Sequence, residues 1–423
     1  MRVLDVPNIR EIFQFWWMIP LLYIYVYQPP VIPKIIYPIS EVLILLGYVI
    51  VTKKSNLMKF FKYYRFETIL LYFLILYVII RDVFSGEIVY SDRFILWSFQ
   101  GFIFPFFIVT IIRNYNKKKV SNKNINLFNM IYWTVFVASI GTVLLLFNKS
   151  FDTFYQSVQV DDLDRYMSFD MRYRAYGISE NLTFTYSFVA GLFSGYSLLV
   201  LEKRKYLFIP MLLALVAVAF NARIGFVAII ILIAIAMLKF KFKNFRILFL
   251  YILLGIFLMM NFFSEYMETL LANKNWVLFF FRDISDTLFG THFNDSGVST
   301  IGILTGEFIV LPKTLMSWIF GTGKSLFIGV ENNTDIGYLL QLNYGGLILL
   351  MILFLLMFVI TYRLYKNFGS SFWYFYFLPI SILILNFKGF IFAGTPGGRV
   401  LFFLYVYFIY DKKSKVENLI END

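Results

Sequence analysis

The stretch 336–361 reads IGYLLQLNYGGLILLMILFLLMFVIT and contains no charged residue. The hydrocarbon core of a bilayer is about 30 Å thick, so a helix needs about 20 mostly apolar residues to cross it. This stretch is longer than that, and its apolar residues are continuous rather than alternating. It therefore predicts a membrane-spanning helix rather than a strand of an outer-membrane barrel.

Similar apolar runs occur along the whole chain, and together they predict about twelve spans. Besides 336–361, the predicted spans lie near 11–28, 35–52, 66–81, 94–112, 127–147, 181–201, 206–221, 223–238, 247–264, 371–387 and 397–410. The linkers between most of them are short. We therefore expect an all-α fold in which residues 1–423 form a single membrane domain.

The composition supports this fold class. Of the 423 residues, 60% are hydrophobic and 15% are charged, whereas soluble domains average about 45–50% apolar and about 25% charged residues. Such a chain is neither a set of soluble domains nor a disordered polymer. It contains no Cys and one His, His292. Disulfides, thiolate metal sites, cysteine nucleophiles and multi-histidine metal sites are thereby excluded, and we expect no metal and no cofactor.

The positive charges predict the orientation of the spans. Lys and Arg collect in cytoplasmic linkers, and a cytoplasmic N-terminus places 24 of the 38 Lys and Arg residues on that side, while most acidic residues fall on the other side. The basic clusters occupy alternate linkers, near 53–65, 113–126, 202–205 and 239–246. Both termini are therefore expected in the cytoplasm. Because the net charge of +12 is spread over separate short linkers, we expect it to contact membrane lipids and not nucleic acid.

Two outer segments are long, 148–180 and roughly 265–335, and long connections usually carry function. Residues 276–290 and 303–320 place apolar and charged residues at near-helical spacing, which predicts amphipathic helices lying in the outer interface. The alternative is a loose lid without chemistry. Residues 321–325 read GTGKS, but a phosphate-binding loop needs glycine where Trp318 stands.

Several cations lie on the predicted outer side, against the general inside bias. Guanidinium groups bind phosphate oxygens through paired, planar hydrogen bonds, so cations from different spans that converge would suit an anionic ligand such as a pyrophosphate. The alternative is that each arginine pairs with a nearby acid, such as those between 161 and 170. The outer cations are Arg165, Arg172, Arg174, Arg223, Lys388 and Arg399.

Acidic residues offer candidates for a general base. Asp335 stands where the long outer segment re-enters the membrane, where it suits either proton abstraction or a helix cap. Glu41 lies inside a predicted span; such carboxylates are functional by default, although a neutral, hydrogen-bonded Glu would also serve. Glu67 lies at a cytoplasmic helix end and is expected to reach the interface. Gly345-Gly346 would permit close packing or a local break in its span.

Ordered motifs along the chain resemble those of a known family. Arg174-Ala175-Tyr176-Gly177-Ile178-Ser179-Glu180-Asn181 precedes a span, and Ala222-Arg223-Ile224-Gly225 opens another. After the long outer segment come Gly321-Thr322-Gly323, Asp335-Ile336-Gly337-Tyr338 and Gly345-Gly346. In this order, and in its topology, the chain resembles the bacterial O-antigen polymerases (Wzy type) and the related O-antigen ligases. The family often has Ser where this chain has Ala222, and ligases carry His where this chain has Asp335. The second difference favours a polymerase.

The resemblance implies an inverting, metal-independent glycosyltransferase of the inner membrane of a bacterium, with its active site facing the periplasm. A glycan on undecaprenyl pyrophosphate would be transferred to a hydroxyl of another lipid-linked repeat unit, and a chain-length regulator would be a possible protein partner. Ligation to a lipid A core, or transport of the glycan, are the alternatives. The implied catalytic residues are Arg174, Arg223 and Asp335, and the implied substrate-binding residues are Arg172, Arg399, Lys388, Tyr338 and Glu180.

Overall fold

The computed structural model describes a helical protein. The described residues are 9, 16–29, 31–33, 36–51, 55–118, 126–157, 183–201, 203–221, 224–239, 309–324, 336–369, 373–392 and 395–420. Within these ranges the secondary structure is helical and contains no strand. The prediction of an all-α fold is therefore confirmed for this part of the chain.

The helices follow one another through connections that are mostly short. In the first half they are α2 (Met18–Tyr27), α3 (Ile36–Val51), α4 (Ser55–Tyr63), α5 (Arg65–Ser85), α6 (Ser91–Ser98), η1 (Phe99–Ile103), α7 (Phe104–Lys118), α8 (Leu127–Phe147) and α9 (Lys149–Ser157). In the second half they are α11 (Thr183–Val200), η2 (Lys205–Leu207), α12 (Phe208–Asn221), α13 (Ile224–Lys239), α17 (Leu315–Phe320), α18 (Gly337–Phe368), α19 (Trp373–Lys388) and α20 (Pro396–Ile420).

Each predicted span except one overlaps a described helix. The exception, 247–264, lies outside the described residues. Among the described helices, four are long and apolar enough to cross a membrane, and they are Arg65–Ser85, Ser91–Asn116, Leu127–Leu145 and Gly337–Phe368. Six further described helices are shorter and apolar, and they are Met18–Tyr27, Ile36–Ile50, Phe184–Val200, Lys205–Val218, Ile224–Ile233 and Leu378–Lys388. These helices fit a membrane-embedded protein, while the number of twelve spans and their orientation stay predictions.

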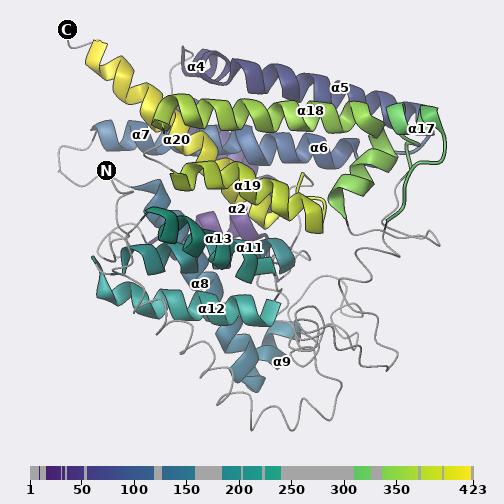
Figure 1. Cartoon of the computed structure of the whole chain (residues 1–423). Coiled ribbons are helices and arrows are strands. Elements are labelled where there is room, and N and C mark those ends of the chain that lie inside the picture. Colours follow the sequence, from purple (N-terminus) through teal and green to yellow (C-terminus); the bar gives the residue numbers. More distant parts are fainter. Residues whose placement is uncertain are drawn as a thin grey trace, which may run out of the picture.

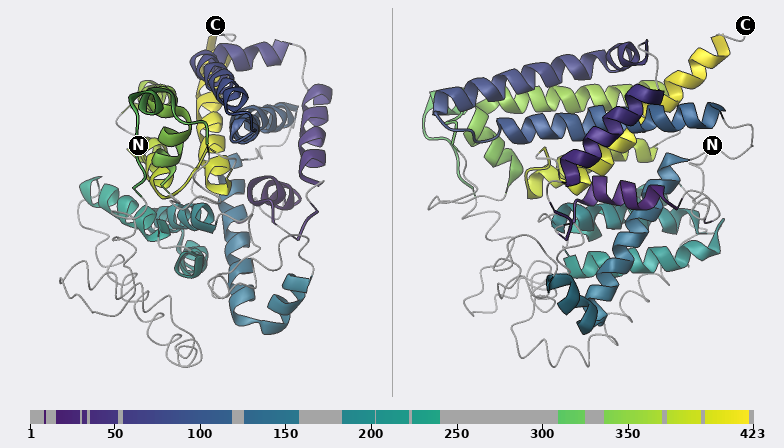
Figure 2. Two further views of the ribbon diagram at one scale, coloured as in Figure 1. Left: turned by 90° about the vertical axis from the view of Figure 1, so that its right-hand side faces the viewer. Right: turned by 180° about the vertical axis from the view of Figure 1, so that it is seen from behind.

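Helix α20 lies in the middle of the bundle. Figure 1 shows α5 and α18 running side by side, and Figure 2 shows α20 with α18 on one side and α3 on the other. Helix α20 contacts α7, η1, α11, α18 and α19, and its stretch from Val400 to Val406 is almost wholly buried. Helices α11, α18 and α19, which adjoin predicted site residues, therefore pack against the last described helix of the chain.

Large aromatic side chains fill the core. Around α20 the Trp97 ring packs edge-on against Phe102, Phe392 and Phe402, with ring centroids 4.9–5.5 Å apart. The outer faces of the peripheral helices are also apolar, as for Ile50, which is 82% exposed, and Phe84, which is 79% exposed. An apolar surface of this kind is suited to contact with lipid tails.

Helix α18 is broken at Gly346, as the paired glycines suggested. Gly346 has φ 66° and ψ −167°, so the element consists of a short limb, 337–345, and a long limb, 347–368. The long limb alone is about 33 Å in length, which is sufficient to cross a bilayer. The single span expected over 336–361 is therefore two limbs of different length and direction.

Candidate functional site

Many of the residues that the sequence singled out fall outside the described part of the chain. This holds for Arg165, Arg172, Arg174, Glu180, Arg223, His292 and Asp335. It also holds for most of the predicted outer segments 148–180 and 265–335, of which α9 and residues 309–324 are described. Tyr338, Lys388 and Arg399 are described, as are Glu41 and Glu67.

Three other helix ends pack against the first turn of α11. At each of these three contacts a glycine meets a residue of α11. A Cβ added to that glycine would lie 2.5–2.8 Å from the α11 residue, which shows how tight the contacts are. The start of α18 joins the group, because Gly337 packs in the same way against the backbone of Gly389. The three pairs at α11 are Ser187 with Gly225 from α13, Phe184 with Gly389 after α19, and Thr185 with Gly397 from α20.

These contacts bring together chain positions that adjoin the predicted site residues. Arg223 precedes Gly225 by two positions, Lys388 directly precedes Gly389, Arg399 follows Gly397 by two, and Asp335 precedes Gly337 by two. Helix α11 itself follows the segment that contains Arg172, Arg174 and Glu180. The helix ends that the charge pattern predicts to face outward therefore meet at the first turn of α11, which we call the α11 junction.

Arg399 lies in the first turn of α20 and is 1% exposed. Its Nε donates to the backbone carbonyl of Val26 across 2.7 Å, and its Nη1 donates to the side-chain oxygens of Gln28 (3.2 Å) and Gln100 (3.1 Å). A cation at the start of a helix is unfavourable for the helix dipole, whereas one at the end of a helix is favourable. The backbone carbonyls at the end of α2 provide the favourable environment of a helix end. Gln28, which follows α2, adopts a left-handed conformation there.

Gln100 connects this buried cation to the acid Glu41. Its Nε2 donates to Glu41 Oε1 across 2.6 Å, while its Oε1 accepts from Arg399. Gln100 lies in η1, a π-helical turn, and its backbone carbonyl accepts a hydrogen bond from the Tyr25 hydroxyl. A π-turn changes the direction of side chains within a helix and is frequent at functional positions. Here it directs the Gln100 side chain between Glu41 on α3 and Arg399 on α20.

The two glycine motifs that carry the family resemblance form one structural unit. The break at Gly346 leaves the last carbonyls of the short limb without helical partners. Thr322 N donates to the Asn343 carbonyl across 2.6 Å, and Gly323 N donates to the Tyr344 carbonyl across 2.9 Å. Gly321 and Gly346 both have positive φ, and a Cβ on Gly346 would lie 2.6 Å from Gly321 N. The GTG sequence therefore caps the short limb of a broken helix. This structural role explains the glycines that make the sequence look like a phosphate-binding loop.

Helix α5 fixes the same unit from the other side. The Tyr77 hydroxyl donates to the Gly345 carbonyl across 2.7 Å, and Arg81 Nη2 donates to the Gly321 carbonyl across 3.0 Å. The Tyr344 hydroxyl donates to Asp82 Oδ1 across 2.5 Å, and Asp82 Oδ2 accepts from Ser91 N across 2.8 Å. Lys324 and Ile336 are the described residues on either side of the undescribed segment that contains Asp335. Both therefore belong to the unit that these hydrogen bonds hold together.

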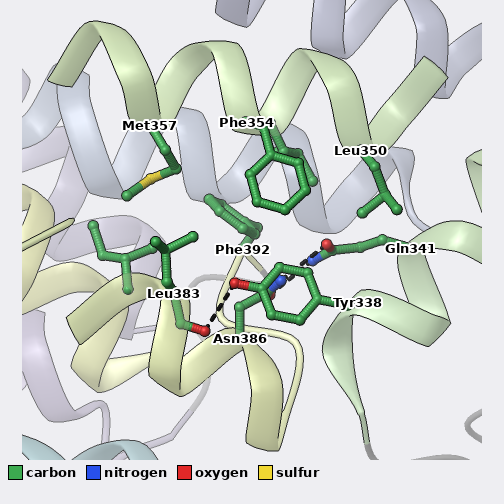
Figure 3. Close-up of a pocket in the computed structure, with 10 residues that line it drawn as sticks. Tyr338, Gln341, Leu350, Phe354, Met357, Leu383, Asn386 and Phe392 are labelled. Atoms are coloured by element: carbon green, nitrogen blue, oxygen red, sulfur yellow. Dashed lines mark hydrogen bonds between the residues drawn. The ribbon is translucent and has the colours of Figure 1, made fainter. Parts of the chain in front are cut away.

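A small hollow lies between the two limbs of α18 and helix α19 (Figure 3). The rings of Tyr338 and Phe354 are stacked at 5.8 Å with an interplanar angle of 7°. In a straight helix these residues would be about 24 Å apart, so their contact shows how steeply the short limb folds back. Gln341 and Asn386 form a reciprocal amide pair with distances of 2.8 and 2.9 Å.

Glu67 does not reach the interface as expected. Its side chain is 0% exposed, and both of its oxygens accept from Arg363 Nη1, at 2.5 and 2.7 Å. The Tyr405 hydroxyl also donates to Glu67, and Arg363 lies over the Tyr64 ring. A carboxylate in an apolar interior is stable when it is paired and hydrogen-bonded, which explains the difference.

Sequence reasoning did not identify Gln28, Gln100, Asp82 or Tyr344. Gln100 has no charged residue near it in the sequence, and that isolation was a usable signal, whereas Asp82 directly follows Arg81. Among the described residues, no cluster of three or more His, Asp or Glu side chains could hold a metal ion. No protein-family model, no curated protein and no solved structure matches this chain.

Proposed function

We propose that this protein polymerises oligosaccharide repeat units carried on undecaprenyl pyrophosphate into O-antigen or a similar surface polysaccharide. The reaction takes place at the periplasmic face of the inner membrane of a bacterium. A hydroxyl of the acceptor repeat unit attacks the anomeric carbon of the donor glycan, and the bond to the lipid pyrophosphate breaks with inversion. The hydroxyl proton passes to a base, and the lipid pyrophosphate leaves as an anion.

The observation that carries this proposal is the α11 junction. Residues next to Arg223, Lys388, Arg399 and Asp335 pack around one helix start, although they are far apart in the sequence. The outer segment with Arg172, Arg174 and Glu180 leads directly into that helix. This arrangement supports a shared site for cations that the sequence alone leaves scattered.

The chemistry explains why cations are needed there. Negative charge develops on the pyrophosphate as the glycosidic bond breaks, and fixed donors that meet this charge lower the barrier. Each charged hydrogen bond contributes roughly 1.5–3 kcal/mol in a partly dry site. We assign direct pyrophosphate contacts to Arg174 and Arg223, with Arg172 and Lys388 beside them. Arg399 is buried, so its contribution is a positive potential from beneath the site.

The acceptor side of the reaction is assigned to the start of α18. Asp335 directly precedes Ile336, the N-cap residue of α18, and the short limb is anchored through Gly323 and Tyr77. The reaction requires a base with a defined position relative to the attacking hydroxyl, and the described limb that follows Asp335 in the sequence is held in place by these contacts. Tyr338 and Glu180 would contact the sugars.

A second candidate function is transport of the lipid-linked glycan. The break in α18 favours it, because transporters build their binding sites from discontinuous helices. Ligation of the glycan to a lipid A core uses the same chemistry as polymerisation and differs in the acceptor.

Gel electrophoresis of the surface polysaccharide distinguishes polymerisation from transport. In cells that carry Arg223→Ala or Arg223→Lys we expect single repeat units on the lipid core in place of a ladder. Arg204→Ala, an exposed arginine in a linker predicted to be cytoplasmic, is the control and should leave the ladder intact. Loss of even the single repeat unit would favour transport, and an unchanged ladder in the Arg223 variants would contradict the proposal.

A further inference from the structure

Two cations come together where the GTG segment crosses the end of α5. Arg81 Nη2 donates to the Gly321 carbonyl across 3.0 Å. A Cβ added to Gly323 would lie 3.3 Å from the same nitrogen and 2.9 Å from Ser85 Cβ. Lys324 directly follows Gly323, so its backbone lies beside the last turn of α5. We call Arg81 and Lys324 the α5 cation pair.

The α5 cation pair has no acidic partner within the described part of the chain. Neither Arg81 nor Lys324 forms an ion pair there. Asp82 follows Arg81 in the sequence, but it is buried, and its oxygens accept from the Tyr344 hydroxyl and from Ser91 N. Of the Arg81 guanidinium nitrogens, Nη2 alone has a hydrogen-bond partner among the described residues. The pair therefore retains positive charge and hydrogen-bond donors for an anion.

Exposed apolar side chains flank the α5 cation pair. Phe84 lies one turn after Arg81 and is 79% exposed, and Phe320, at the end of α17, is 42% exposed. Leu315 and Met316 of α17 are 76% and 68% exposed. Figure 1 shows α17 beside the end of α5. A free anion would leave these side chains uncovered, whereas the acyl chains of a phospholipid would cover them while its phosphate meets the cations.

The charge pattern predicts that both cations face outward. Helix α5 follows the basic linker 53–65 and therefore ends on the opposite side, and Lys324 belongs to the predicted outer segment 265–335. Lys and Arg are generally depleted on that side, so orientation signals do not account for this pair. Basic residues at a membrane surface attract anionic lipid headgroups, which does account for it.

We propose that Arg81 and Lys324 bind the phosphate of an anionic glycerophospholipid of the outer leaflet, such as phosphatidylglycerol. Its acyl chains cover the exposed side chains of α17 and of the end of α5, so that the lipid links α5 to the GTG segment. The short limb of α18, about 13 Å long, separates this site from Gly337 at the α11 junction. The inference is therefore independent of the proposed function.

Native mass spectrometry of the full-length protein in detergent tests this assignment. The protein is titrated with dioleoylphosphatidylglycerol, and the apparent Kd of the first bound lipid is measured. Arg81→Gln and Lys324→Gln each remove one charge and should weaken binding about fivefold, as is typical of one basic residue at a membrane surface. Lys324→Arg keeps the charge and should bind like the unsubstituted protein. Unchanged binding in both glutamine variants would overturn the proposal.

Glu87→Gln is the matched control at the same helix end. Glu87 is exposed in the turn after α5, where its backbone bonds to Ser85. Removing its negative charge should leave binding equal or make it tighter. A loss as large as that in Lys324→Gln would show that charge does not decide the binding. If Arg81→Gln fails to fold, Lys324→Gln decides the test, because Lys324 is exposed.

Three further ligands identify the source of the phosphate. Dioleoylphosphatidylcholine has the same acyl chains without net charge and should bind at least fivefold more weakly, and equal binding would reduce the site to an apolar contact. Displacement of phosphatidylglycerol by millimolar inorganic phosphate would show a small-anion site and contradict a lipid. Farnesyl pyrophosphate that binds more tightly than phosphatidylglycerol, and that Lys324→Gln also weakens, would assign the site to an isoprenoid lipid and overturn the proposal.

Discussion

Gly225 at the start of α13 lies directly against Ser187 at the start of α11, so that a Cβ on Gly225 would lie 2.5 Å from the Ser187 carbonyl oxygen. Ser187, Gly191 and Gly195 follow one another at intervals of four along α11, and all three face α13. This is the spacing with which small residues allow helices in membranes to approach closely. It fixes the backbone two positions beyond Arg223.

Gly225→Ala tests this contact. The added methyl group has no space, and overpacking of this kind costs about 1–3 kcal/mol, so we expect a lower unfolding temperature of the purified protein in detergent. Gly47→Ala is the matched control, because its nearest neighbour would be the Ile111 side chain at 3.6 Å, an ordinary contact. Equal behaviour of the two variants would show that α11 and α13 are not as close as described.

Gly346→Ala tests the capped break in α18. The substitution brings both a strained positive φ and a clash with the backbone of Ile319 and Gly321. Gly369→Ala separates the two effects, because Gly369 has nearly the same backbone conformation (φ 57°, ψ −164°) with nothing within 4 Å of its Cβ position. Gly369→Ala should cost about 1–3 kcal/mol through backbone strain alone, and Gly346→Ala clearly more. Equal losses in chemical unfolding would argue against the contact between the two glycine motifs.

Arg399→Lys tests the buried network. A lysine has one charged nitrogen and cannot bond to Val26, Gln28 and Gln100 in the geometry of a guanidinium. We expect a loss of about 3 kcal/mol, typical of a buried charge that loses its partners. Arg65→Lys, at an exposed position of α5, should change stability by less than about 0.5 kcal/mol. A silent Arg399→Lys would show that the three bonds contribute little.

A double-mutant cycle tests the Glu67–Arg363 pair. Glu67→Gln and Arg363→Gln each leave one buried charge without its partner and should each cost about 3–5 kcal/mol. The double variant removes both charges and should be more stable than the sum of the single losses predicts. Additive losses, measured by chemical unfolding, would show that the two side chains do not interact in the folded protein.

The positions of the apolar helices were predictable because they depend on local composition. A long run without charged residues is stable in apolar surroundings, where a helix satisfies its backbone hydrogen bonds. Every predicted span within the described residues overlaps a helix. The break in α18 was visible in Gly345-Gly346, because adjacent glycines weaken a helix. The partner that caps the break was not visible, since the contact of Gly323 with Tyr344 depends on how distant segments fold together.

The polar network shows a different limit. Arg399 and Glu41 were each conspicuous as charges in an apolar chain, but no sequence pattern links one to the other. Their connection runs through Gln100, which lies in a π-helical turn. Glu67 lies near a helix end, which suggested that its side chain reaches the membrane interface. The side chain is buried instead because it pairs with Arg363, which is 296 positions away in the sequence.

Turnover by the purified protein is the most direct measurement of the central claim. The full-length protein in nanodiscs is supplied with the host strain's own repeat unit on undecaprenyl pyrophosphate, with a chelator present. We predict that glycans of two or more repeat units form, that free undecaprenyl pyrophosphate is released in step, and that Arg174→Ala and Arg223→Ala abolish both. Undiminished turnover in both variants, or no elongation by the intact protein when the substrate is bound, would contradict the account.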